Sequence, residues 1–462
     1  MGTHSGTHLD PSIGTGIGTN FGDIAVARRV VTVSQAAHFN GWRDGFRYGL
    51  LGLPLAFVAL PLYVILPSHY AREFDVPLRA LGAILLITRL FDAVIDPLLG
   101  RWSDHLFARS INAVLVFGAV AALLLGVGFA MLFFPLLPKP HAQRDVMVWL
   151  TVFLMVTYAA YSALSVAHQS WGAMLGGDEA QRSRIVAWRE GFGLLGVLVA
   201  SITPVALGLP ATVAIFIGAI VVGWLAWSRA VRPSASPTFK TGSVWQPLQR
   251  AEFRRLLTVF MLNGIASAIP ATLILFFVQD RLQAPKSLEP AFLGSYFLCA
   301  ALAIPLWLRL VKHIGLARTW LAGMLLSMAV FIFATQLGVG DSTPFIVVCA
   351  LSGIALGTDL AIPAALLAGT ILDAGDRGRA EGAYFGWWNF ATKLNLALAA
   401  GVALPLLAAF GYAPGVRTEG ALQALTVAYC LLPCALKFCA ATALYFLIIR
   451  PASALRLTTP LT

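Results

Sequence analysis

The sequence predicts an all-α membrane protein whose twelve transmembrane helices form two six-helix bundles. Of its 462 residues, 58% are hydrophobic and 11% are charged, whereas soluble domains carry about 25% charged residues; the mean hydropathy is +0.80. Twelve apolar stretches follow one another along the chain, and each is long enough to cross the hydrocarbon core as a helix. A polar segment midway along the chain separates them into two sets of six.

The first set of apolar stretches lies at about 47–67, 80–100, 111–135, 147–171, 188–208 and 211–230. The second set lies at about 256–279, 290–311, 318–338, 344–370, 384–409 and 423–449. Because the two sets are equal in number, the simplest architecture is one six-helix bundle from each half of the chain.

The polar segments give the predicted domain boundaries. Residues 1–45 are rich in Gly, Thr and His and lack an apolar core, so we expect a disordered cytoplasmic tail there. The bundles then cover 46–231 and 256–450, and a cytoplasmic linker at 232–255 joins them. A short cytoplasmic tail at 451–462 completes the chain.

The net charge of +11 indicates membrane orientation rather than nucleic-acid binding. The basic residues are spread thinly over alternate connections and form no patch with interleaved aromatic residues. Since cytoplasmic connections carry the excess of Lys and Arg, we expect a multi-pass protein of a bacterial-type inner (plasma) membrane with both termini in the cytoplasm. All five cysteines lie within apolar stretches, so we expect no disulfide framework and no metal site.

The stretch RLFDAVIDPLLGRWSD, residues 89–104, places ionisable groups inside an apolar helix. Asp92 and Asp96 are four residues apart and share one helix face, and Arg89 lies close to that face. Because each such charge costs about 2.5–3.5 kcal/mol at mid-membrane, we expect the carboxylates to bind a coupling cation, Na⁺ or a proton, with Thr88 completing the coordination. The alternative is a static network that only holds helices together.

Other polar residues at membrane depth are candidates for the same site. Lys393, in the predicted eleventh helix, is the natural counter-cation for the two aspartates. Asp359 and His168 either line a substrate pocket or make contacts between helices. Trp388 either stacks on a sugar ring or anchors its helix at the membrane interface. Lys437, in the last helix, is expected to serve packing.

Three blocks carry a further signal: RLFDAVIDPLLGRWSD in the second helix, GGDEAQRSRIVAWREGFGLLG after the fourth, and LDAGDRGRAEGAYFGWWNFATKLN leading into the eleventh. Together they resemble the glycoside–pentoside–hexuronide:cation symporters, the melibiose-permease-like branch of the major facilitator superfamily. The resemblance implies the fold of that superfamily. It also implies that Asp92 and Asp96 take the coupling cation, that Lys393 lies beside them, and that Arg189 lies near the substrate on the cytoplasmic side.

Two features depart from that family's pattern. GRWSD matches the start of the superfamily's G-x-x-x-D pattern, whose acid holds a gate, but the basic-Gly-basic continuation is absent; Asp104 is expected to be either a gate or a helix cap. The first helix, YGLLGLPLAFVALPLY, lacks the acid that binds sugar hydroxyls in the family. Ser165 stands where a second sugar-binding aspartate is expected, with Gln169 and His168 nearby. The cation half of the site is kept and the sugar half is rewritten.

These observations predict a cation-coupled secondary active symporter that moves a small organic solute by alternating access of two bundles. A sugar or glycoside is the favoured solute and uptake the favoured direction. The apolar first helix keeps open an amphiphile such as a lysophospholipid, and a non-transporting sensor on the same fold is a further alternative. A membrane enzyme is disfavoured because the short loops offer no Ser/His/Asp or His/Glu cluster. We expect a monomer without a cofactor, whose partners are the solute, the cation and the lipid bilayer.

Overall fold

The computed structural model describes Gly2, Phe39 and residues 41–137, 142–233, 243–413 and 415–451. The predicted tails at 1–45 and 451–462 lie almost wholly outside the described residues, as does the middle of the predicted linker. Every regular element within the described ranges is helical.

The first half of the chain begins with a spanning helix over Trp42–Glu73. It consists of α1 (Trp42–Gly49), α2 (Gly52–Phe57), a π-helical turn (Pro61–Ile65) and α3 (Leu66–Glu73). The further helices of this half are α4 (Leu78–Arg109), α5 (Ile111–Phe133), α6 (Gln143–Leu175), α7 (Glu179–Ala206) and α8 (Gly208–Ser228).

The second half begins with a short helix, α9 (Gln246–Gln249), which lies in the predicted linker. The longer helices are α10 (Ala251–Phe276, continued by a π-helical turn at Phe277–Arg281), α11 (Glu289–Ile314, preceded by a 3₁₀ turn at Lys286–Leu288), α12 (Leu316–Ala334), α13 (Ser342–Asp373) and α14 (Glu381–Ala409). The last spanning helix joins α15 (Glu419–Thr426), a π-helical turn (Val427–Leu431), α16 (Leu432–Leu444) and a second π-helical turn (Tyr445–Ile449).

The predicted fold class is confirmed. Among the described residues, ten helices are long and apolar enough to cross a membrane. The two other helices of that length, α4 and α14, contain polar side chains that lower their hydropathy, among them Asp92, Asp96 and Lys393. Each predicted apolar stretch overlaps one of these helices. Most helices are longer than predicted, because membrane helices continue past the hydrocarbon core into the headgroup region.

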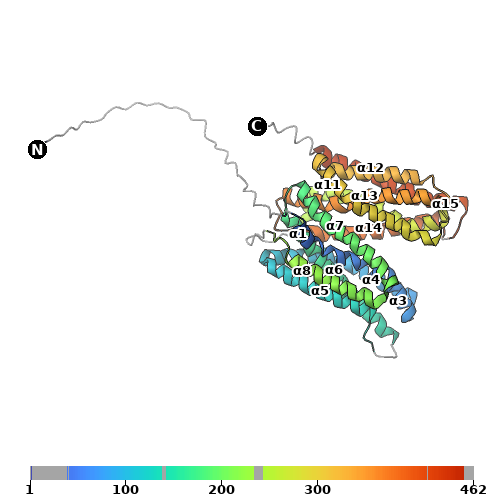
Figure 1. Cartoon of the computed structure of the whole chain (residues 1–462), viewed down its shortest axis with the longest axis horizontal. Coiled ribbons are helices and arrows are strands. Elements are labelled where there is room, and N and C mark those ends of the chain that lie inside the picture. The colour runs from blue at the N-terminus through green and yellow to red at the C-terminus, as the bar shows by residue number, and fades with distance from the viewer. Residues whose placement is uncertain are drawn as a thin grey trace, which may run out of the picture. The chain divides into compact units, whose positions relative to one another are not determined.

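Each half has a buried apolar core of its own. Phe57, Phe129 and Phe216 pack together in the first half, and Phe277 and Tyr429 do so in the second. Contacts between helices join the halves: α4 and α6 pack against α14, and α7 packs against α11 and α13. Figure 1 shows the green α7 beside the yellow and orange helices of the second half.

Glycines allow α4 and α14 to touch backbone to backbone. A Cβ added to Gly382 would lie 2.1 Å from the carbonyl oxygen of Gly100, and one added to Gly386 would lie 2.6 Å from that of Asp96. Small residues at a helix interface permit this close approach in membranes. The contact positions Lys393, farther along α14, over the aspartates of α4.

Candidate functional site

The two aspartates of α4 lie on the helix face that meets α6 and α14. Asp92 is 3% exposed and Asp96 is fully buried. A buried carboxylate is stable only when it is paired or strongly hydrogen-bonded. The predicted placement of both residues on one face therefore requires partners from the neighbouring helices.

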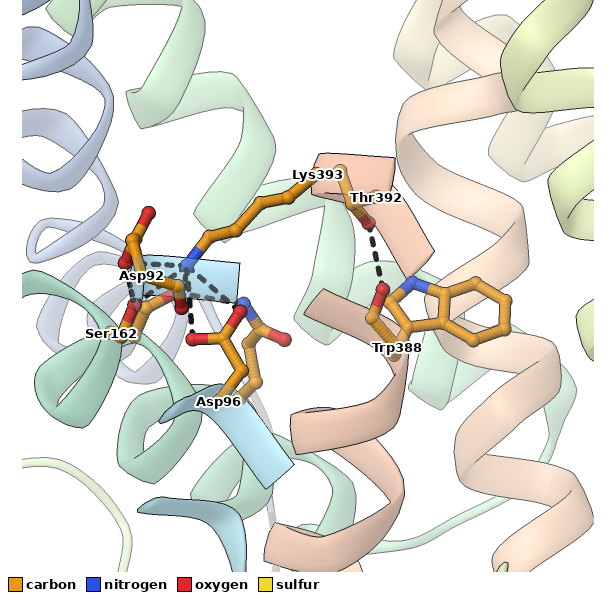
Figure 2. Close-up of polar contacts among 8 residues, drawn as sticks. Asp92, Asp96, Ser162, Trp388, Thr392 and Lys393 are labelled. Atoms are coloured by element: carbon orange, nitrogen blue, oxygen red, sulfur yellow. Dashed lines mark hydrogen bonds and ion pairs between the residues drawn. The ribbon is translucent and has the colours of Figure 1, made fainter. Parts of the chain in front are cut away.

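Lys393 of α14 supplies the charged partner. Its Nζ lies 2.7 Å from Asp92 Oδ1 and 2.8 Å from Asp96 Oδ2. It also donates to Asp96 Oδ1 at 3.0 Å and to the backbone carbonyl oxygen of Asp92 at 3.1 Å. Figure 2 shows the lysine side chain reaching from its helix into the space between the two carboxylates.

A hydroxyl from α6 completes the cluster. Lys393 Nζ donates to Ser162 Oγ at 2.8 Å, and Ser162 Oγ donates to Asp92 Oδ1 at 2.9 Å. We call Asp92, Asp96, Ser162 and Lys393 the carboxylate cluster. Ser162 is not predicted from the sequence, because a serine in an apolar helix carries no signal until its neighbour is known.

The ammonium of Lys393 stands where a monovalent cation with oxygen ligands would stand. Carboxylate, carbonyl and hydroxyl oxygens surround it, and these are the groups that bind hard cations. Two carboxylates face one ammonium, so the cluster has one negative charge in excess. Asp96 Oδ2 also has no hydrogen-bond partner among the described residues, although it lies within ion-pair distance of the lysine. The cluster can therefore accept a further cation or a proton.

The two other predicted cation-site residues of α4 point to different partners. The hydroxyl of Thr88 donates to the carbonyl oxygens of Ile84 and Leu85, at 2.8 and 3.2 Å, so Ser162 rather than Thr88 provides the hydroxyl of the cluster. The guanidinium of Arg89 lies over the ring of Tyr63, 4.4 Å from its centroid. Arg89 is therefore a positive group beside the cluster and not its main counter-charge.

Of the predicted pocket residues, Arg189 and Gln169 come together at the boundary of the halves. They line a cavity of about 10 Å³ with Tyr48 and Phe385, among other residues, which is room for about one water molecule. Arg189 Nε donates to the carboxylate of Glu190 at 2.9 Å, and Gln169 donates to Ser165 at 2.9 Å. Each of the two therefore has a polar partner on its own helix.

Two predicted pocket residues belong to the packed interior instead. His168 is fully buried; its Nε2 lies 2.8 Å from the carbonyl oxygen of Tyr48, and its ring packs against Trp227. Trp388 stacks on Phe260 with the ring centroids 3.8 Å apart, and Figure 2 shows it directed away from the carboxylate cluster. Both side chains therefore make contacts between helices, and their roles in a substrate pocket stay predictions. Interhelix packing was the alternative for His168, and the partner of Trp388 could not be inferred from its position in the sequence.

Asp359 belongs to a second ionic network, which lies wholly within the second half. Its Oδ1 accepts from Asn263 and Trp320, each at 2.9 Å, and its Oδ2 accepts from Ser267 and from Lys437, each at 3.2 Å. Lys437, which was expected to serve packing, is thus the ionic partner of Asp359. We call these five residues the Asp359–Lys437 network.

Asp104 contacts the other half at the end of its helix. The side chain is 2% exposed, and its carboxylate accepts from the backbone amides of Gly382 at 2.6 Å and Ala383 at 2.9 Å. These amides begin α14, where a negative charge is favourable. In the same way, Glu179 of α7 accepts from the amide of Leu316 at the start of α12, at 2.8 Å. Two carboxylates of the first half therefore cap two helices of the second.

The linker is also tied to this end of the second half. Gln246 and Arg250 donate to the carboxylate of Asp376 at 2.8–3.1 Å. Arg250 precedes the membrane-spanning part of its helix, and its hydrogen bonds and charge attraction to Asp376 raise the pKa of its guanidinium.

Comparison with known proteins identifies the family of the chain. A family model described as MFS/sugar transport protein matches residues 47–450. The glucuronide carrier protein homolog of Escherichia coli K12 is 23% identical over 440 residues, which are 88% of this chain and 92% of that protein. YagG of the same strain, provisionally described as a glycoside/cation symporter, is 24% identical over 161 residues, 34% of each chain.

A solved structure shares the fold. The fucose:proton symporter of E. coli, FucP, superposes with a TM-score of 0.64 at 14% identity, covering 87% of this chain and 99% of that one. At this low identity the superposition concerns the fold alone.

Proposed function

We propose that this chain is a cation-coupled symporter of a sugar or glycoside. The chain belongs to the MFS/sugar transport family, as a member of its glycoside–pentoside–hexuronide:cation symporters. It is therefore a multi-pass membrane transporter of sugars rather than an enzyme. The observation that carries the proposal is the carboxylate cluster. It has an excess negative charge, and its carboxylates and its ammonium belong to opposite halves of the chain.

The coupling cation would bind between Asp92 and Asp96. Sodium or a proton at this point neutralises the excess charge and competes with Lys393 for the same oxygens. The lysine, released in part, can then donate to the solute at the boundary of the halves. Each ligand thus favours binding of the other, and the linkage is reciprocal. Arg189, near the same boundary, is the second proposed solute contact.

The contacts of Asp104 and Glu179 give the proposed gate. They hold the halves together at one end, which the distribution of basic residues predicts to be cytoplasmic. Alternating access requires that these caps separate when the loaded transporter opens at this end. Because each cap joins a carboxylate to backbone amides, it can break and form again without unfolding either helix.

The names of the curated relatives favour a glycoside or a sugar acid as the solute. An amphiphile is the second candidate, because no acid lies in the first spanning helix between Gly52 and Glu73 to bind sugar hydroxyls. Sensing without transport is the weaker alternative, since both coupling carboxylates are retained and held in place.

The test is uptake of radiolabelled methyl β-D-glucuronide and methyl β-D-glucoside into proteoliposomes under an imposed Na⁺ or proton gradient. We expect one gradient to drive accumulation of at least one of these solutes by the wild type, and Asp96→Asn to lose that dependence. Asp145→Asn is the matched control, because Asp145 is an exposed carboxylate at the start of α6. Uptake that ignores both gradients would contradict the symport mechanism.

A further inference from the structure

The second half of the chain encloses a cavity of about 230 Å³, far larger than the space beside Arg189. It lies between α10, α11, α12, α13 and the last spanning helix. Its walls are mainly apolar and aromatic; Phe297, Phe331, Leu356 and Tyr429 are among them. Cavities of this character, with a few convergent polar groups, are the usual form of a small-molecule site.

The ionic residues that line the cavity have no free charge to offer. Asp359, Lys437 and Ser267 line it, and all belong to the Asp359–Lys437 network. The carboxylate accepts four hydrogen bonds, and the ammonium donates three, to Asn263 Oδ1, Ser267 Oγ and Asp359 Oδ2. Since these use the full capacity of both groups, an ionic ligand would find no free partner here.

The lining residues also include a buried hydroxyl without a partner in the described part of the chain. Ser352 is 8% exposed, and its Oγ has no hydrogen-bond partner among the described residues. Tyr296, from α11, lines the same space. A buried hydroxyl without a partner calls for one, and a ligand with a single polar substituent on an apolar body would supply it.

The cavity also borders the boundary between the halves. Phe297 and Leu356, which line it, pack against Ala187 and Leu194 of α7 in one apolar cluster. A solute held at the boundary can therefore extend an apolar group into the second half.

We propose that this cavity binds the aglycone of an amphipathic glycoside, an aromatic or branched alkyl group, while the sugar lies at the boundary of the halves. This inference rests on the proposed function and names its solute class more closely. It also reconciles the two solutes predicted from the sequence, a sugar or glycoside and an amphiphile. A first helix without a sugar-binding acid fits a transporter that gains much of its affinity from the apolar part of a glycoside.

The test compares para-nitrophenyl β-D-glucuronide with methyl β-D-glucuronide, and the corresponding pair of glucosides, by calorimetry on purified protein in saturating Na⁺ at two pH values. The members of each pair share the sugar and differ only in the aglycone. We expect the nitrophenyl compound to bind roughly ten- to hundredfold more tightly, as burial of one aromatic ring predicts. Ala271→Trp, which fills the cavity from an exposed wall position on α10, should remove that advantage and leave methyl glycoside binding unchanged.

Two further variants make the result specific. Ser352→Ala should lower affinity for the nitrophenyl compound several-fold, because the nitro group loses its hydroxyl partner. Val127→Trp, in an apolar surface groove of the first half, should change neither affinity. Thermal unfolding of each variant shows whether it is folded.

The outcomes separate the two proposals. Cation-dependent binding of a methyl glycoside with no aryl advantage, or an aryl advantage that survives Ala271→Trp, would overturn the aglycone site and leave symport intact. Failure of all four compounds to bind would reject the proposed solute class together with the aglycone site.

Discussion

Two lysines of membrane-spanning helices, Lys393 and Lys437, bind carboxylates inside this protein, and their surroundings differ in two respects. Lys393 lies between two aspartates, whereas Lys437 faces one aspartate and two neutral side chains. The carboxylate cluster joins the two halves of the chain, whereas the Asp359–Lys437 network joins helices of a single half.

Charge balance and location together distinguish a site that couples cation and solute binding from a network that only holds helices together. A balanced pair inside one half keeps its partners whichever way the halves rock, so it can hold α10, α13 and α16 together throughout a transport cycle. An unbalanced cluster between the halves attracts a cation, and its contacts change when the halves move. On the proposed mechanism the same residue types serve two purposes, and composition alone does not distinguish them.

The largest effect is expected from removal of either carboxylate of the carboxylate cluster. Asp92→Asn and Asp96→Asn balance or eliminate the excess charge, so cation stimulation of solute binding, about 5–150-fold in coupled systems, should disappear. Uptake driven by a cation gradient should fall to the level of empty liposomes. Full gradient-driven uptake by both variants would mean that the carboxylate cluster only holds helices together, as the Asp359–Lys437 network does.

The next largest effect should concern stability and not coupling. Lys437→Met leaves a buried carboxylate without its counter-charge, a change that typically costs about 3–5 kcal/mol. The double variant Asp359→Leu/Lys437→Met should recover much of that loss, and cation dependence should survive in it. Thermal unfolding in detergent measures the first effect, and loss of cation dependence in a folded double variant would argue that the network takes part in coupling.

Lys393→Ala should have an intermediate effect. Without the ammonium, the carboxylates have no competitor for the coupling cation, so apparent cation affinity should rise while the solute gains less from the bound cation. Isothermal titration with Na⁺ and with solute checks both quantities. If neither the cation affinity nor the effect of the cation on solute affinity changes, Lys393 serves only in packing.

The smallest effect is expected at the gate. Asp104→Asn weakens hydrogen bonds to a charged acceptor, each worth about 1.5–3 kcal/mol, so the protein should populate the state opened at that end more often. Electron-paramagnetic distances between labels at Arg109→Cys and Arg318→Cys, in a background lacking the native cysteines, should lengthen. Asp178→Asn is the control, because Asp178 caps its own helix within the first half. Equal lengthening of the distance between the labels in Asp104→Asn and Asp178→Asn would contradict the assignment of Asp104 to the gate.

The sequence predicted much of the fold and the meeting of Asp92, Asp96 and Lys393 for a simple reason. Helix spans follow from hydropathy, and the pairing of Asp92 with Asp96 follows from a spacing of four residues on one helix. Lys393 could be assigned as their counter-charge because few buried cations were available. Each of these inferences uses local sequence or charge balance.

The other contacts could not be predicted from the sequence because they depend on which helices pack together. Ser162 joins the cluster only because α6 packs beside α4, and Lys437 meets Asp359 of α13 only because the last helix packs beside α10 and α12. Trp388 was predicted either to stack on a sugar ring or to anchor its helix, and in the structure its ring stacks on Phe260. Which side chain covers which depends on how helices are rotated and paired, and hydropathy contains no information on rotation.

The most direct test of the central claim is the affinity of purified protein for a transported glycoside, measured with and without the coupling cation in wild type and in Asp96→Asn. The carboxylate cluster predicts that the cation strengthens solute binding in the wild type and has no effect in the variant. Equal strengthening by the cation in both proteins would contradict the assignment of the coupling site to Asp92, Asp96 and Lys393.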